Sequence, residues 1–72
     1  MLHKQIKRRL GELFFSERRM KGYELRYVSR KTHISIGMLD FMEQGRGHNN
    51  WKKYKELLDF YGKEIKIDFQ DK

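Results

Sequence analysis

LRYVSRKTHISIGMLDFMEQ, residues 25–44, is the stretch that decides the fold. Its apolar residues recur at helical spacing on both sides of a break, which predicts two short helices that meet at a tight corner. Ser35 stands where an N-cap belongs, directly before the second helical run. Ile34 and Leu39 flank this cap at the spacing of a hydrophobic staple. An ordinary helical hairpin with an apolar core would show the same signals.

Helices are also predicted on either side of this corner, over residues 2–19 and 51–61. The first has an apolar stripe made of Leu2, Ile6, Leu10, Leu13 and Phe14. Gly11 lies beside this stripe and would allow a close helix crossing. The cations around the stripe are interpreted as a solvated face, of which a subset near the helix ends could touch phosphates. The last helix has one apolar face, made of Trp51, Tyr54, Leu57, Leu58 and Tyr61.

The last segment, residues 64–72, changes its period. Ile65, Ile67 and Phe69 alternate with charged residues, which predicts a short strand with one buried face. A lone strand leaves its backbone groups unpaired, so we expect it to pair antiparallel with the same strand of a second copy. The alternative is a tail that packs onto its own core. Residues 1–63 are therefore expected to form the helical domain, and residues 64–72 the dimerisation element.

The composition restricts the classes of function. The chain has 72 residues and a formal net charge of +7, which favours a polyanionic partner, although solvated surface charge would give the same number. Without cysteine there can be no disulfide and no zinc site of the cysteine type. No apolar run approaches a membrane span, and no signal peptide is evident, so we expect a cytoplasmic protein without membrane contact.

Catalytic and metal-binding patterns are not evident either. His3, His33 and His48 fall on separate elements, and no pair of them has ligand spacing on one helix. The serines lack a nearby arrangement of histidine and acid that would activate a nucleophile. We therefore expect no metal, no cofactor and no enzymatic activity.

Short motifs along residues 6–62 resemble those of a known family. KTHIS at residues 31–35 is similar to a "K-x-G-I-S" corner, with His33 where the family has glycine. MEQGR at residues 42–46 is similar to the family's run around "E-R-G", and Trp51 to Gly62 follow the spacing of its last helix. These features resemble the helix-turn-helix domain of the Cro/C1-type, or XRE, repressors. The resemblance implies an all-α, four-helix, lambda-repressor-like domain, here followed by a short C-terminal β-strand.

The resemblance also implies a function and a site. The protein would be a sequence-specific DNA-binding regulator of transcription, of phage, plasmid or toxin-antitoxin type, that binds double-stranded DNA as a homodimer. His33, at the corner position, would need a positive φ. The residues expected to contact DNA are Arg26, Arg30, Lys31, Ser35, Ile36, Gly37, Asp40, Phe41, Arg46, His48, Asn49 and Lys52.

The outward side of the second corner helix leaves other partners open. Base edges are usually read by Arg, Lys, Asn or Gln, and the outward residues Ile36, Gly37, Asp40 and Phe41 include none of these. Exposed apolar residues beside a carboxylate also suit a protein contact. A protein-protein interaction module on the same scaffold is therefore the alternative function, and structured RNA is a third possible partner.

Overall fold

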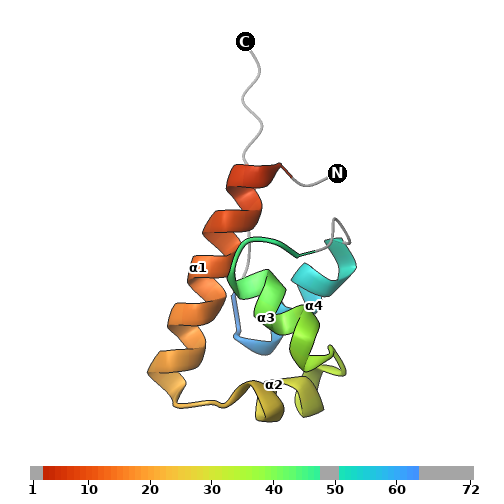
Figure 1. Ribbon diagram of the computed structural model, residues 1–72. Helices are drawn as coiled ribbons and strands as arrows, with labels where there is room; N and C mark the ends of the chain where they lie inside the picture. The colour runs from red at the N-terminus through yellow and green to blue at the C-terminus, as the bar shows by residue number, and fades with distance from the viewer. Residues whose placement is uncertain (1–2, 48–50, 64–72) are drawn as a thin grey trace.

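Four α-helices make up the part of the chain that the computed structural model describes, residues 3–47 and 51–63 (Figure 1). They are α1 (Lys4–Lys21), α2 (Leu25–Thr32), α3 (Ile36–Glu43) and α4 (Trp51–Phe60). No strand occurs within these described ranges, so the predicted all-helical class with four helices is confirmed there. The predicted strand with Ile65, Ile67 and Phe69 lies outside the described residues, as do Leu2, His48 and Asn49.

The long helix α1 stands along one side of the molecule, and the three shorter helices gather beside it (Figure 1). α1 packs on α3, α3 on α2, and α2 on α4. The core contains residues from all four helices and from the corner before α3. Its buried apolar residues are Leu10, Phe14, Val28, Ile34, Leu39, Met42, Tyr54, Leu57, Leu58 and Tyr61. The Phe14 ring links α1 to α4, because its centroid lies 6.2 Å from that of Tyr54 and 6.3 Å from that of Tyr61.

Two described residues of the predicted apolar stripes are exposed. Ile6 keeps 48% of its surface exposed and Trp51 keeps 39%. Both lie in the first turn of a helix, at the edge of the helical array. An 18-residue helix is about 27 Å long, so the end of α1 extends past its shorter neighbours. The apolar periodicity identified the correct face of α1, but not how far along the helix the neighbouring helices cover that face.

The corner between α2 and α3 forms as predicted. Ser35 caps α3, because its side chain accepts a hydrogen bond from the backbone N–H of Met38 at 3.1 Å. His33 has φ 63°, the left-handed conformation expected where the family has glycine. The Thr32 hydroxyl accepts a bond from the Ile34 N–H at 3.3 Å. These contacts hold α3 at a fixed angle to α2.

The crossing of α1 and α3 is close because of Gly11. A Cβ atom at this position would lie 2.5 Å from the carbonyl oxygen of Met42 and 2.7 Å from that of Glu43. Real side chains cannot occupy that space, so the backbones meet only because residue 11 has no side chain. The close crossing expected from the sequence is confirmed, and α3 is the partner helix.

An ion pair also joins α1 to the C-terminal end of α3. Arg18 of α1 donates to both carboxylate oxygens of Glu43 on α3, at 2.7 and 3.1 Å. A third guanidinium bond reaches the carbonyl oxygen of Tyr23 at 3.0 Å. The hydrogen bonds from Arg18 to Glu43 raise the pKa of the arginine, which favours the charged guanidinium. Arg18 thus joins α1, α3 and the segment before α2. It is one of the cations around the α1 stripe that the sequence analysis interpreted as a solvated face, and for Arg18 that interpretation is wrong.

Candidate nucleic-acid interface

The exposed side of α3 is the centre of the candidate site. Ile36, Gly37, Asp40 and Phe41 are all exposed, as predicted, and 46% of the surface of both Ile36 and Phe41 is open to solvent. They are exposed because the opposite side of the helix carries buried core residues. The face offers two apolar side chains, one carboxylate and no side-chain hydrogen-bond donor. It can therefore contact methyl groups and accept a bond from an amino group.

Cations lie on the neighbouring helix α2. Arg26 and Arg30 are exposed and one helical turn apart, so they project from the same side of α2. Lys31 is also exposed, and its ammonium lies 5.7 Å from the ring centroid of Tyr27. Because α2 packs against α3, these charges are next to the helix that presents the apolar face.

Arg46 is brought to this face by the way α3 ends. Gly45 has φ 78°, a conformation that suits glycine, and its N–H donates to the carbonyl oxygen of Met42 at 3.1 Å. The N–H of Arg46 donates to the carbonyl oxygen of Phe41 at 2.8 Å. Together these bonds form a Schellman motif, which turns the residue after the glycine back over the last helical turn. The guanidinium carbon of Arg46 lies 5.2 Å from the Phe41 ring centroid, and the guanidinium also donates to Gln44 Oε1 at 3.2 Å.

Sequence reasoning did not predict the contact between Arg46 and Phe41. The signal was present, because a glycine directly after a helix typically ends it with this motif, and the motif brings the flanking side chains together. The ion pair of Arg18 with Glu43 was also missed. Its residues are 25 positions apart, and periodicity carries no information on such a pairing.

The remaining predicted residues are more scattered. Ser35 is exposed at the start of α3, but its oxygen is already engaged as the helix cap. Lys52 is exposed on α4. His48 and Asn49 lie outside the described residues. The structure thus brings the α3 face and Arg46 together, places three cations on the adjacent helix, and leaves Lys52 on a different element.

Comparisons with family models, with curated proteins and with solved structures find no match to this chain. The interpretation of the site therefore depends on its own residues. Within residues 3–47 and 51–63, no group of three or more His, Cys, Asp or Glu side chains is placed to hold a metal ion. In the same ranges, no helix has the length and apolar character needed to cross a membrane.

Proposed function

We propose that this protein is a small sequence-specific DNA-binding regulator of transcription, of phage, plasmid or toxin-antitoxin type, with a lambda-repressor-like helix-turn-helix domain. One observation carries the proposal: a short N-capped helix, packed through one side on its neighbours, leaves its other side open between exposed cations. The resemblance of the corner and of the last helix to the Cro/C1-type family supports it. In this proposal, α3 enters the major groove and α2 lies across the phosphate backbone.

The α3 face has chemistry that suits some base edges. Ile36 and Phe41 can contact thymine methyl groups, and the Asp40 carboxylate can accept a hydrogen bond from a cytosine amino group. Gly37 has open space where a side chain would be, so bases can approach the backbone closely there. The carboxylate repels phosphates, which favours an orientation in which Asp40 points into the groove.

The phosphates are contacted by cations around that face. Arg26 and Arg30 of α2 and Arg46 after α3 are exposed and long enough to reach the backbone. Lys31, Lys52, His48 and Asn49 complete the set that the resemblance implies. Since each contact releases counterions, binding weakens steeply as the salt concentration rises.

The proposal includes a homodimer. Two copies joined through the segment that contains Ile65, Ile67 and Phe69 would present two α3 helices to half-sites about one helical turn of DNA apart. Dimerisation also adds buried surface to a chain whose own core is small.

The test is a binding series of the full chain with mixed-sequence duplex DNA at increasing salt. The double variant Arg26→Ala/Arg46→Ala should reduce the slope of log affinity against log salt by about 2, because each lost phosphate contact lowers it by about 1. The matched control, Lys53→Ala/Lys55→Ala, removes the same charge from two positions on α4 outside the predicted set and should leave the slope unchanged. Equal loss in the two double variants would contradict the proposal, since binding would then follow net charge alone.

The second candidate function is a protein-protein interaction module on the same scaffold. The observation that favours it is the apolar character of the exposed α3 face, where Ile36 and Phe41 are each nearly half open to solvent. Phe41→Ala separates the two candidates. Loss of preference among DNA sequences supports the first, whereas unchanged DNA binding together with loss of a protein complex supports the second.

A further inference from the structure

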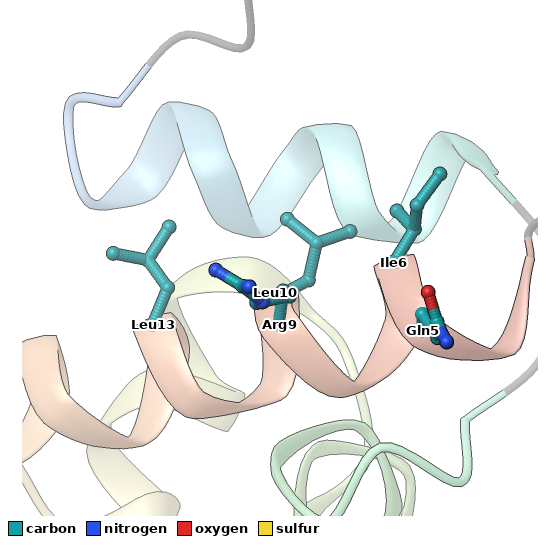
Figure 2. Close-up of a pocket in the computed structure, with 5 residues that line it drawn as sticks. All are labelled: Gln5, Ile6, Arg9, Leu10 and Leu13. Atoms are coloured by element: carbon teal, nitrogen blue, oxygen red, sulfur yellow. The ribbon is translucent and has the colours of Figure 1, made fainter.

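An open apolar groove runs along α1 on a side that the candidate interface does not use. Ile6, Leu10 and Leu13 line its floor, with Gln5 and Arg9 beside them, and its volume is about 410 Å³. Figure 2 shows the three apolar side chains projecting from α1 on the side where α4 lies. Phe14 joins the two helices at one end of this face through its ring contacts. Towards the start of α1 the floor stays open, which is why Ile6 is exposed.

The described chain ends next to this groove. Lys63 follows α4, and its N–H donates to the carbonyl oxygen of Leu58 at 2.8 Å. Its ammonium lies 3.2 Å from a carboxylate oxygen of Glu17 on α1. Glu17 is four residues after Leu13, so it continues the same side of the helix as the groove floor. The described part of the chain therefore ends at the end of the groove that lies towards the C-terminus of α1.

We propose that residues 65–69 of the same chain occupy this groove as an extended segment antiparallel to α1. The floor residues are one helical turn apart, about 5.4 Å, and alternate residues of an extended chain are about 6.6 Å apart. The difference between the two repeats is small enough that three successive pairs of side chains can meet. With Lys63 opposite Glu17, the pairs that follow are Ile65 with Leu13, Ile67 with Leu10, and Phe69 with Ile6.

Charge favours this segment over a second copy of α1. No acidic residue lies in the first turn of α1, and the cations Lys4, Lys7, Arg8 and Arg9 surround the groove end. Two such helices face to face would bring these charges together. The segment carries three acids, Glu64, Asp68 and Asp71, and two lysines, Lys66 and Lys72. Asp68 and Asp71 would come to the N-terminal end of α1, where the helix dipole also attracts anions.

Occupying the groove uses only the apolar side of the segment. Its backbone edge remains available to pair with the same segment of a second copy, so the proposed dimer and the filled groove are compatible. The inference does not depend on DNA binding, because neither α2 nor the exposed face of α3 takes part.

The test uses the absence of cysteine from the sequence, which allows a pair to be introduced without competing thiols. In the full chain, Ile6→Cys/Phe69→Cys should form a disulfide within one chain under mild oxidation at low protein concentration. Ile6 is exposed, so the substitution leaves the core intact. The control Met20→Cys/Phe69→Cys places the first cysteine at the far, exposed end of α1 and should stay reduced. Intact mass and non-reducing gels distinguish the products.

Each other outcome overturns the proposal. Disulfide-linked dimers of the first variant, under conditions where the control gives none, would assign the groove to the segment of a second copy. Equal oxidation of both variants within one chain would show an undocked segment, and no oxidation of the first would exclude the register. A second pair, Arg9→Cys/Ile67→Cys, checks the same register at the rim of the groove. All of these results are obtained without DNA, so they are independent of the test of DNA binding.

Discussion

At the scale of single residues, two helical glycines have opposite surroundings. A Cβ atom at Gly11 would meet backbone carbonyl oxygens of α3 at 2.5 and 2.7 Å, whereas one at Gly37 would have nothing within 4 Å. Glycine costs a helix about 1 kcal/mol relative to alanine at either position. Only at Gly11 does the packing of two helices compensate for that cost.

The variants Gly11→Ala and Gly37→Ala should therefore change stability in opposite directions. Gly11→Ala should lower the free energy of unfolding by about 2 kcal/mol, because the added methyl group forces α1 and α3 apart. Gly37→Ala should raise it by up to about 1 kcal/mol. Urea unfolding followed by circular dichroism measures both changes. An unaltered or increased stability of Gly11→Ala would rule out the close crossing.

Part of this residue-scale detail could be predicted from the sequence. A glycine inside an amphipathic helix indicated a close crossing. The resemblance of the corner to a family that has glycine there implied the positive φ of His33. The contact of Arg46 with Phe41 depends on local geometry, but it becomes visible only when the glycine after α3 is interpreted as a Schellman motif and not simply as a stop.

At the scale of elements, three helices end in the same way. After each glycine, the next N–H donates back to a carbonyl oxygen of the last turn: Tyr23 to Arg18 at 3.0 Å, Arg46 to Phe41 at 2.8 Å, and Lys63 to Leu58 at 2.8 Å. Glycine adopts the conformation that these ends require readily. The sequence predicted the end of the first helix at residue 19, two residues before its observed end at Lys21. The sequence also did not predict the exposure of Ile6, since apolar spacing identifies the buried side of a helix but not the length of its neighbours.

The contact between α1 and α3 also depends on the Arg18–Glu43 pair. Glu43→Gln should lower the free energy of unfolding by about 2 kcal/mol, less than for a fully buried pair, because the arginine keeps a small exposed area. Thermal or urea unfolding at neutral pH gives this value. Glu12→Gln, an exposed acid of α1, is the control and should change stability by less than about 0.5 kcal/mol. Equal effects of the two substitutions would mean that the pair contributes only surface charge.

At the scale of the whole molecule, apolar spacing was enough to predict four helices and the outward side of α3. It could do so because each helix buries one stripe against the others. The identity of the partner was not encoded in that spacing, because exposure of Ile36 and Phe41 results equally from contact with bases and from contact with another protein. The charges on α2 and at Arg46 favour the nucleic acid.

The oligomeric state is a further property of the whole molecule. In sedimentation equilibrium, the native chain should be a dimer, and Ile67→Lys should weaken the dimer by at least about tenfold. The segment must place Ile67 in an apolar contact before its edge can pair with the second copy, and a charge cannot enter that contact without cost. Gln70→Lys adds the same charge three residues after Ile67, on the polar side of the alternation, and should leave the dimer intact. A dimer of undiminished strength in Ile67→Lys would exclude this interface.

The guanidinium of Arg46 lies over the ring of Phe41, and this contact couples the binding of an anion to the binding of an apolar group. An anion that binds Arg46 and moves it outward also exposes one side of the Phe41 ring. An apolar group that contacts the same side of the ring must first displace the Arg46 guanidinium. A rotation of the Arg46 side chain therefore changes the position of the charge and the exposure of the apolar ring at the same time. A partner that presents a negative group next to a methyl group can contact both.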